Sequence, residues 1–331
     1  MESTYWTLGI LSVFSLCGGL AWAEQPSTSP STGRGVTAPG AKVELLSREF
    51  KFTEGATCDA EGNVFFTDQP NDRIMKWSVD GKLSVFMQPA GRSNGMIFSP
   101  QGDLYSCADA QNELWLIKPD KKVTVLVKEY EGKLLNGPND VWLRPDGGLY
   151  ITDPFYKRDY WNRGPKEQEV EGVYYLPPET KADRKRATQA RPIEGVALPR
   201  KLTRVIDDLK TPNGITGTPD GKILYVSDLA AQKTYAYDIQ PDGSLTNKRL
   251  FCEMGSDGMT IDNEGNVYLT AKGVFVFDKT GQRIDHIEVP EPWSANVCFG
   301  GKDRKTLFIT ASKGLYAVKM RVQGVNQKGG K

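Results

Sequence analysis

The strongest constraint on the fold is an internal repeat that begins at six places in the chain. Each copy has a polar residue, a short apolar run, a turn residue eight positions on, and then a strand rich in aromatic and β-branched residues. The copies begin at Glu54, Asn94, Asn139, Asn213, Asp257 and Asn296, and are spaced by 40, 45, 74, 44 and 39 positions. Glycine is the turn residue in every copy except the sixth, which has Arg304. This period is typical of a four-stranded propeller blade, so we predict an all-β, six-bladed β-propeller.

The ends of the repeated region predict how the ring closes. Runs such as residues 149–152 are strands by composition, and Asp-Gly or Glu-Gly pairs mark hairpin turns. The last repeat has strands near residues 306–310 and 314–319 and is then one strand short. Residues 42–46 precede the first repeat and have no blade of their own. We expect this N-terminal strand to complete the sixth blade, which removes the exposed sheet edges. The alternative, an array of β-sandwiches, would not need one register across six units.

The first 23 residues differ from the rest of the chain. Residues 5–23 are apolar and uncharged, and Ala21-Trp22-Ala23 has the small-x-small pattern of a cleavage site. We predict a signal peptide over 1–23 and an exported protein, periplasmic or extracellular. Glu2 stands where a cation is usual, and an uncleaved anchor is the alternative, although the apolar stretch is short for a membrane span.

The remaining boundaries follow from composition. Residues 24–42 are rich in Ser, Thr, Pro and Gly, which predicts a disordered spacer. A single propeller domain is expected over 43–320, followed by a polar tail over 321–331. Because no large apolar run follows Ala23, no stable membrane insertion is expected after cleavage.

Charge and histidine content exclude several functions. The 42 Lys and Arg residues balance 41 Asp and Glu, without the basic stripe of a nucleic-acid binder, so no nucleic-acid partner is expected. The single histidine, His286, excludes a multi-histidine metal site and argues against a Ser-His-Asp triad. It lies in an alternating run that predicts a half-exposed strand position.

The cysteines do not form a recognisable framework. Cys58, Cys107, Cys252 and Cys298 are far apart and lie in strand-like runs. This pattern favours buried thiols over a zinc site or a set of disulfides. Export would allow one disulfide, and the sequence leaves that point open.

The first residue of each repeat is the best candidate for chemistry. In a propeller the first strand of each blade is innermost, so these six residues face the central channel at one end of the ring. Two carboxylates and four amides make a cluster of oxygen ligands that suits a hard divalent cation, with calcium first and magnesium, manganese or zinc as alternatives. The alternative is that the polar residues hydrate the channel mouth or shape the turns. Glu54 favours the metal, because glutamate is not a turn residue.

A second series of acids stands at the end of the next strand. It consists of Asp68, Asp109, Asp153 and Asp228. Strand pairing brings these residues to the same face as the first series, where they could orient ligands. We expect most of them to cap turns instead, with Asp153 as the exception because a long insertion follows it.

The insertion in the third repeat has two parts. Residues 154–171 fall on the same face as the predicted metal and contain Phe155, Tyr156, Arg158, Tyr160, Trp161 and Arg163. Aromatic faces and cations suit a lid over a polar, sugar-like ligand, although a packed surface loop is the alternative. Residues 177–199 fall on the opposite face and predict a solvated hairpin excursion.

The repeat register, together with short motifs, resembles a known family. The motifs are Thr53-Glu54-Gly55, Pro138-Asn139-Asp140, Thr152-Asp153-Pro154, Pro212-Asn213-Gly214 and Ser256-Asp257-Gly258. They are similar to those of the gluconolactonase family that includes the senescence marker (regucalcin) proteins, over about residues 43–320. The resemblance implies a propeller that holds a catalytic divalent metal, often calcium, and hydrolyses a small sugar lactone.

The resemblance also implies roles for particular residues. By position, Glu54, Asn213 and Asp257 would be metal ligands, Asn139 would contact metal or substrate, and Asp257 would be the general base. Some members of the family have Arg two places before the Asn-Asp pair, where this chain has Gly137. This chain must therefore bind its substrate through different contacts. The residues that we expect to contact substrate are Asn94, Asn139, Asn296, Asp153, Arg158 and Trp161.

The chemistry of lactone opening suits such a site. A divalent cation stabilises the developing oxyanion, and a carboxylate can take the proton of the attacking water. Two alternatives stay open: a propeller hydrolase acting on phosphotriesters or aryl esters, and a propeller that only binds a ligand. The two converging carboxylates favour an enzyme over a binding module.

Overall fold

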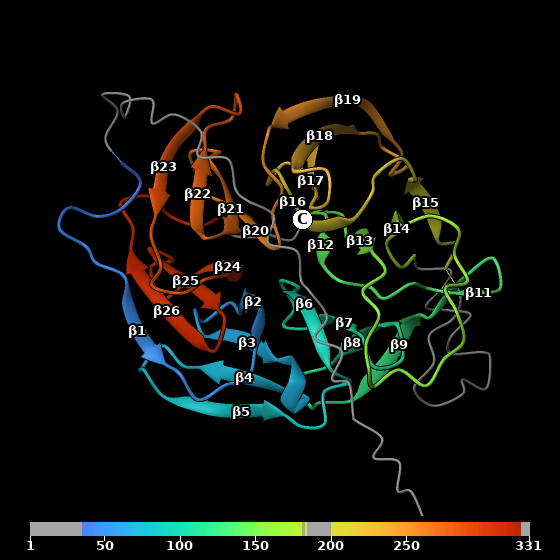
Figure 1. Cartoon of the computed structure of the whole chain (residues 1–331), viewed down its shortest axis with the longest axis horizontal. Helices are drawn as coiled ribbons and strands as arrows, with labels where there is room; N and C mark the ends of the chain where they lie inside the picture. The colour runs from blue at the N-terminus through green and yellow to red at the C-terminus, as the bar shows by residue number, and fades with distance from the viewer. Residues whose placement is uncertain (1–34, 181–182, 184–199, 326–331) are drawn as a thin grey trace, which may run out of the picture. The chain divides into compact units, whose positions relative to one another are not determined.

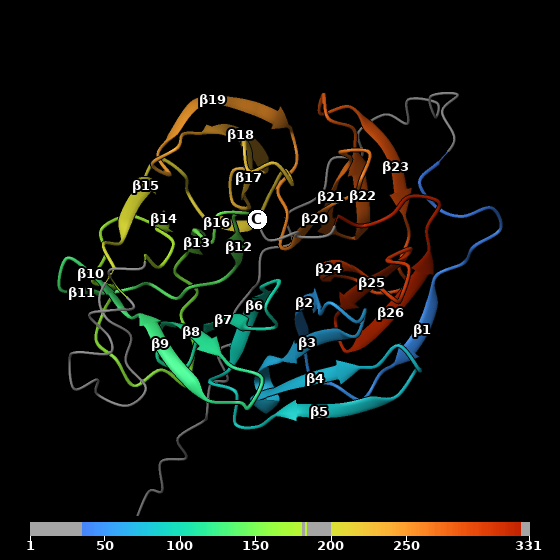
Figure 2. The same ribbon diagram turned by 180° about the vertical axis from the view of Figure 1, so that it is seen from behind.

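The computed structural model describes residues 35–180, 183 and 200–325. The chain divides into two compact units, and the second, Gly33–Lys331, contains all of these residues. Within this unit, six antiparallel four-stranded sheets are arranged as the blades of a ring, as Figures 1 and 2 show from opposite sides. The prediction of a six-bladed β-propeller is confirmed.

The strands follow one another in blade order. Blades 1 and 2 are β2 (Thr53–Cys58), β3 (Val64–Asp68), β4 (Arg73–Trp77), β5 (Leu83–Met87), β6 (Ser93–Phe98), β7 (Leu104–Ala108), β8 (Glu113–Ile117) and β9 (Val123–Val127). Blades 3 and 4 are β12 (Val141–Leu143), β13 (Leu149–Asp153), β14 (Gly172–Leu176), β15 (Thr203–Ile206), β16 (Pro212–Gly217), β17 (Ile223–Asp228), β18 (Lys233–Ile239) and β19 (Leu245–Cys252). Blades 5 and 6 are β20 (Met259–Ile261), β21 (Val267–Ala271), β22 (Gly273–Phe277), β23 (Arg283–Ile287), β24 (Ser294–Gly300), β25 (Thr306–Ala311), β26 (Gly314–Lys319) and β1 (Glu44–Ser47). A 3-10 turn, η1 (Gln69–Asn71), and a small hairpin, β10 (Glu129–Tyr130) with β11 (Lys133–Leu134), lie between these strands.

The ring closes through the N-terminal strand. β1 pairs antiparallel with β26, with Glu44 opposite Ala317 and Leu45 opposite Tyr316. The first strands β2, β6, β12, β16, β20 and β24 contact one another in this order, and β24 contacts β2. The predicted closure is therefore confirmed, and the sixth sheet has the order β1-β26-β25-β24.

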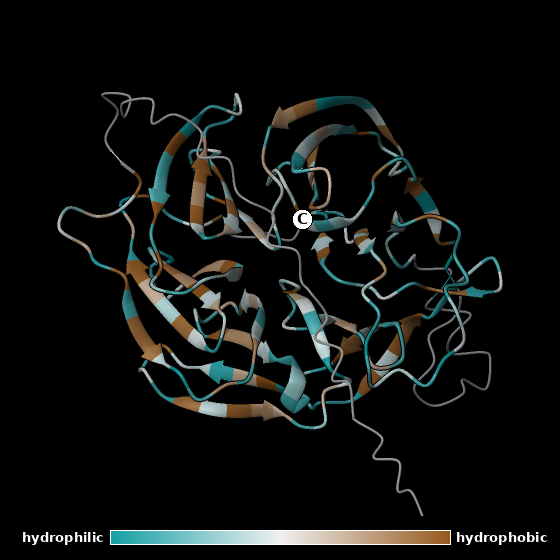
Figure 3. Ribbon diagram, viewed as in Figure 1, coloured by the Kyte–Doolittle hydropathy of each residue, from teal (hydrophilic) through white to brown (hydrophobic). Residues whose placement is uncertain are grey.

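Apolar side chains pack between neighbouring blades. Phe66 of blade 1 packs with Phe308 and Leu315 of blade 6, and Tyr150 of blade 3 packs with Leu224 of blade 4. Figure 3 shows hydrophobic stretches along the strands and hydrophilic residues in most loops. Each fully buried side chain of this size contributes about 1.5–3 kcal/mol, so the contacts between blades stabilise the ring as a whole.

The turn residue of each repeat has a left-handed backbone, which explains the regular glycines. Gly62 has φ of 95° in the first repeat, and such a value is strained for residues with a Cβ atom. Arg304 takes the same place in the sixth repeat with φ of 52°. Its Nη2 donates a hydrogen bond of 2.8 Å to the main-chain oxygen of Asp59 in blade 1, so this arginine ties the two blades at the closure.

The folded region extends beyond the boundaries predicted from composition. Val36 is 1% exposed, and Thr37 pairs with Met320, because an apolar side chain in the Ser- and Pro-rich segment finds a site between blades 5 and 6. At the other end, Val322 is buried in the same cluster. The structure therefore differs from the predicted spacer and tail at residues 35–42 and 321–325.

Some predictions fall on parts of the chain that are not described. The predicted signal peptide lies outside the described residues, as does most of the predicted excursion over 177–199. Across residues 35–180, 183 and 200–325, the structure has no helix that is long and apolar enough to cross a membrane.

Candidate active site

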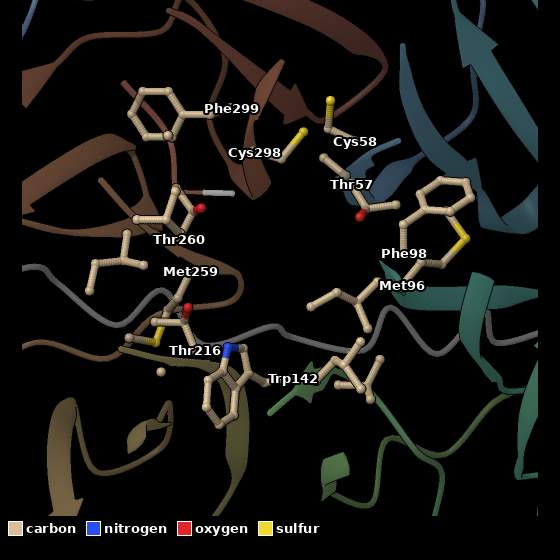
Figure 4. A pocket seen from close by; sticks show the side chains of 18 of the residues that line it. Thr57, Cys58, Met96, Phe98, Trp142, Thr216, Met259, Thr260, Cys298 and Phe299 are labelled. Carbon is tan, nitrogen blue, oxygen red and sulfur yellow. The ribbon is translucent and has the colours of Figure 1, made fainter. Parts of the chain in front are cut away.

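Two cavities lie at opposite ends of the first strands. The first, of about 550 Å³, lies where these strands begin and is lined by Glu54, Asn94, Asn139, Asn213 and Asp257. The second, of about 390 Å³, lies where the same strands end. Figure 4 shows its labelled lining, which comes from all six blades: Thr57, Cys58, Met96, Phe98, Trp142, Thr216, Met259, Thr260, Cys298 and Phe299. The two carboxylates predicted to carry the chemistry are in the first cavity, which we call the acidic pocket.

The two carboxylates of the acidic pocket are held close to each other. Glu54 is 3% exposed, and its Oε2 accepts a 2.6 Å hydrogen bond from the main-chain N–H of Gly55. Asp257 Oδ2 accepts a 2.7 Å hydrogen bond from the indole N–H of Trp293. One oxygen of each carboxylate is thus held by a short hydrogen bond, and side-chain hydrogen bonding from Asn296 to Glu54 and from Asn213 to Asp257 adds to it.

Burial disfavours the ionised form of both groups. The pKa of Glu54 is raised well above 4.5 by burial first and by the charge of Asp257 second. Burial raises the pKa of Asp257 from 3.8 to about 6, although hydrogen bonds from Trp293 and Asn213 act in the opposite direction. A cation placed between two such carboxylates would offset both the burial and the repulsion.

The amides supply the observation that tests whether a cation fits. Asn213 donates a 3.1 Å hydrogen bond from Nδ2 to the hydroxyl oxygen of Tyr156. Its Oδ1 is buried without a hydrogen-bond partner among the residues that the structure describes, and so is Oδ1 of Asn94. An unpartnered buried acceptor is costly, so these oxygens fit a cation ligand better than an empty pocket.

The donor set restricts which metal would fit. No cluster of three or more His, Cys, Asp or Glu residues within 35–180, 183 and 200–325 is placed to hold a metal ion. A metal in the acidic pocket would therefore be held by the two carboxylates and by amide oxygens. Such oxygen-only ligation suits calcium, magnesium or manganese better than zinc.

Asn296 is the one member of the six-residue series that does not line the acidic pocket. Its Oδ1 accepts a 2.8 Å hydrogen bond from the main-chain N–H of Val297, and the residue lines the second cavity. Hydrogen bonding from Asn296 lowers the pKa of Glu54, so the amide supports that carboxylate from the side of the channel. Its predicted contact with substrate stays a prediction.

Asp140, which follows Asn139 in its motif, lines the second cavity. Its two oxygens accept hydrogen bonds from the main-chain N–H groups of Val141 and Ile215, which joins blade 3 to blade 4. Burial raises its pKa to about 8. The motif that contains Asn139 is thus also a structural link between two blades.

Three members of the second acidic series hold the loop that precedes the first strand of their own blade. Asp68 accepts hydrogen bonds from the N–H groups of Lys51 and Phe52. Asp153 does the same for Asn136 and Gly137. Asp228 does the same for Lys210 and Thr211. These contacts are structural, as expected, but they hold the preceding loop and not the following turn. Asp153 has the same role as the others and does not line the acidic pocket.

The insertion forms one wall of the acidic pocket. Tyr156, Arg158 and Tyr160 line the cavity. Trp161 does not line it: its indole N–H donates a 2.6 Å hydrogen bond to the main-chain oxygen of Asp109. A Cβ atom on Gly137 would lie 3.1 Å from the Trp161 ring, so the glycine makes room for the insertion.

Several pocket residues were missed by the sequence analysis. Gln69 lies in η1 of blade 1, Arg92 lies in the loop between β5 and β6 that joins blades 1 and 2, and Trp293 immediately precedes β24. The position of Trp293, three residues before the repeat position Asn296, is a clue that could have indicated it. Gln69 and Arg92 lie between strands and have no comparable sequence pattern.

The fold and the acidic pocket define a class of protein: a six-bladed propeller with paired carboxylates and amide oxygens at one mouth of its central channel. The chain belongs to the SMP-30/Gluconolactonase/LRE-like family, whose model matches residues 52–313. The family resemblance predicted from the motifs is thereby confirmed.

Individual relatives are similar over most of the chain. A gluconolactonase from Zymomonas mobilis is 28% identical over 313 residues, which cover 85% of this chain and 82% of that protein. The solved structure of a gluconolactonase from Xanthomonas campestris is 27% identical, with a TM-score of 0.75 over 86% of this chain and 91% of its own. A calcium-binding protein, regucalcin, from Agrobacterium tumefaciens is 19% identical with a TM-score of 0.67 over 85% of this chain and 94% of its own, and is therefore similar in fold alone.

Proposed function

We propose that this protein is an exported, divalent-metal-dependent lactonase that opens a sugar lactone. The observation that carries the proposal is the pairing of Glu54 with Asp257 beside the unpartnered Oδ1 of Asn213. The similarity to a gluconolactonase over most of both chains supports the reaction class. Export is inferred from the apolar N-terminal segment alone.

The residues that would hold the metal are Glu54, Asn213 and Asp257, with Asn94 and Asn139 beside them. Calcium is the first candidate because every donor is oxygen, with magnesium, manganese or zinc as alternatives. When bound, the metal supplies a Lewis acid that polarises the carbonyl oxygen of the lactone. The pocket wall, which includes Tyr156 and Tyr160, provides an aromatic and polar surface for the sugar.

Asp257 is the general base in this proposal. Trp293 donates a 2.7 Å hydrogen bond to its Oδ2, which orients the carboxylate that would accept the proton of the attacking water. Burial raises the pKa of the carboxyl group to about 6, which gives it more basicity than an exposed aspartate while it stays mostly ionised near pH 7. The base and its orientation are thus both provided by residues of this chain.

The test is acid release from glucono-1,5-lactone, followed by pH-stat. The protein is assayed after chelation, after addition of calcium, magnesium, manganese or zinc, and as an Asp257→Asn variant. The matched control is Asp120→Asn, because Asp120 is exposed in the turn between β8 and β9 and does not line the pocket. We expect metal-dependent hydrolysis that Asp257→Asn abolishes and Asp120→Asn retains.

A different result would reject the proposal. If the metal-loaded protein opens no sugar lactone above the background rate, the lactonase assignment fails. The same protein would then be assayed on an aryl ester and a phosphotriester. Export is tested separately, by fractionating cells that express the full chain and comparing the mass of the recovered protein with that expected after loss of residues 1–23.

A further inference from the structure

Asp109 departs from its equivalents in the other blades. Asp68, Asp153 and Asp228 hold the loop before the first strand of their own blade through its main-chain N–H groups. In blade 2 that task belongs to Asp72, whose Oδ1 accepts hydrogen bonds of 3.0 Å from Ala90 and 2.6 Å from Arg92. The carboxylate of Asp109 is thereby available for other partners.

Those partners are side chains that line the acidic pocket. Asp109 Oδ2 accepts hydrogen bonds from Arg158 Nε at 2.9 Å, from Gln69 Nε2 at 3.2 Å and from the hydroxyl group of Tyr160. Its main-chain oxygen also accepts the indole N–H of Trp161. The insertion from blade 3 is therefore anchored on blade 2 by one buried carboxylate.

This anchoring presents a guanidinium group to the cavity. Arg158 lines the pocket with its side chain 27% exposed, and its charge lowers the pKa of Asp257. Only Nε is engaged with Asp109. Within the described part of the chain, no hydrogen bond holds Nη1 or Nη2 of Arg158, so these donors are available to a ligand.

A second guanidinium group lies on the same wall. Arg92 also lines the pocket, and its Cζ lies 4.2 Å from the centre of the Tyr160 ring. Its Nη1 donates to the main-chain oxygen of Pro70, and none of the described residues forms an ion pair with it. Burial raises the pKa of Asp109, whereas the charges of Arg158 and Arg92 both lower it. On this wall two guanidinium groups therefore share one carboxylate, which leaves one positive charge in excess.

We propose that this wall is a subsite for an anionic group, such as a phosphate or carboxylate, on the lactone substrate. The proposal rests on the lactonase function proposed above and names the class of lactone. Two arginines can bind an oxyanion through several charge-assisted hydrogen bonds, which a neutral hydroxyl group cannot match. The reacting carbonyl would face Glu54 and Asp257, and the anionic group would face Arg158 and Arg92.

The experiment compares two lactones that differ only in this group. kcat/KM is measured for glucono-1,5-lactone and for 6-phosphoglucono-1,5-lactone with the wild-type protein and with Arg158→Gln and Arg92→Gln. Lys118→Gln is the control, because this cation forms a surface ion pair with Asp103 outside the pocket. We expect the wild-type protein to prefer the phosphorylated lactone by about tenfold or more, and each arginine variant to reduce that ratio about tenfold.

Two outcomes would overturn the proposal. One is equal kcat/KM for both lactones in the wild-type protein. The other is an equal loss for both lactones in the arginine variants, which would mean that the arginines act on the reacting centre. Both outcomes require that the wild-type protein opens the neutral lactone.

Binding separates this inference from failure of the proposed function. The dissociation constants of 6-phosphogluconate and gluconate are measured by calorimetry with the wild-type protein and Arg92→Gln. If neither lactone is opened, the lactonase proposal fails, while tighter binding of 6-phosphogluconate that Arg92→Gln weakens still supports an anion subsite. Equal binding of the two acids overturns the subsite.

Discussion

Neutralising Asp257 is expected to stabilise the metal-free protein. The carboxylate is held in a buried position beside Glu54, and its ionised form is disfavoured by that environment. Asparagine has nearly the same shape and retains an oxygen that can accept the Trp293 N–H. Asp257→Asn therefore removes an unfavourable charge and keeps the packing. Such a substitution at a catalytic site typically increases stability and decreases activity.

The magnitude follows from the shift in pKa. The pKa of Asp257 rises from 3.8 to about 6, and each unit corresponds to about 1.4 kcal/mol, so ionisation costs on the order of 3 kcal/mol. The folded protein binds a proton at Asp257 more tightly than the unfolded chain does. Protonation of Asp257 therefore contributes to the free energy of unfolding, and this contribution is fully present below about pH 4. It is lost as the pH rises through about 6. In chelator at pH 8, Asp257→Asn should therefore be more stable than wild type by up to about 3 kcal/mol, or about 5 °C in Tm.

Thermal unfolding in chelator at pH 4.5 and pH 8 measures this difference. We expect a clear advantage for Asp257→Asn at pH 8 and a much smaller one at pH 4.5. The matched control is Asp228→Asn, which should lose stability because Asp228 accepts hydrogen bonds from the N–H groups of Lys210 and Thr211. Saturating calcium should then stabilise wild type by about 2.7 kcal/mol at 100 times Kd and Asp257→Asn by less. If Asp257→Asn is the less stable protein in chelator at pH 8, the reasoning is refuted.

Three further predictions concern other parts of the molecule. Trp293→Phe removes the 2.7 Å hydrogen bond to Asp257 and should weaken calcium binding by about 10- to 100-fold in calorimetry; unchanged affinity would deny Trp293 an orienting role. Burial raises the pKa of Cys58 to about 12, so about one thiol in ten thousand is ionised at pH 8. Iodoacetamide should then label it about a thousandfold more slowly in the native protein than in urea by mass spectrometry, and comparable rates would contradict this. A chain that begins at Phe50 lacks β1 and leaves the edge of β26 unpaired, so it should melt at lower temperature and associate in size-exclusion chromatography; a stable monomer would show that β1 is dispensable.

The architecture could be predicted because each blade repeats the same physical requirements. Every copy has an apolar first strand that packs around the channel and a turn whose left-handed backbone favours glycine. Arg304 departs from that turn preference, yet it has the same positive φ, because its side chain gains a hydrogen bond to Asp59. The register therefore survives one unfavourable residue. The closing strand could be predicted by elimination, since β26 would otherwise have an open edge.

The acidic pocket could be predicted in part, for the same reason. Equivalent positions in a ring face the same axis, which brings Glu54, Asn94, Asn139, Asn213 and Asp257 to one cavity. Asn296 occupies the same register but turns its Oδ1 to the main chain of Val297. The sequence pattern specifies where a Cα atom lies on the ring, and the rotamer then depends on neighbours that the pattern does not contain.

Specificity is harder to predict, because it depends on what makes one blade unlike the others. Asp109 looks equivalent to Asp68, Asp153 and Asp228 in sequence, and the expectation that Asp153 would be the unusual member followed from its place before the insertion. The structure shows that Asp72 holds the blade 2 loop, which frees Asp109 for the insertion. The resulting contact joins Asp109 to Arg158, about 50 positions further along the chain. It depends on Asp72, which lies outside the repeated register. The repeat thus provides the scaffold and the reacting groups. The wall of the pocket depends on blade 2, in which the acid at the repeated position no longer holds the loop before the first strand.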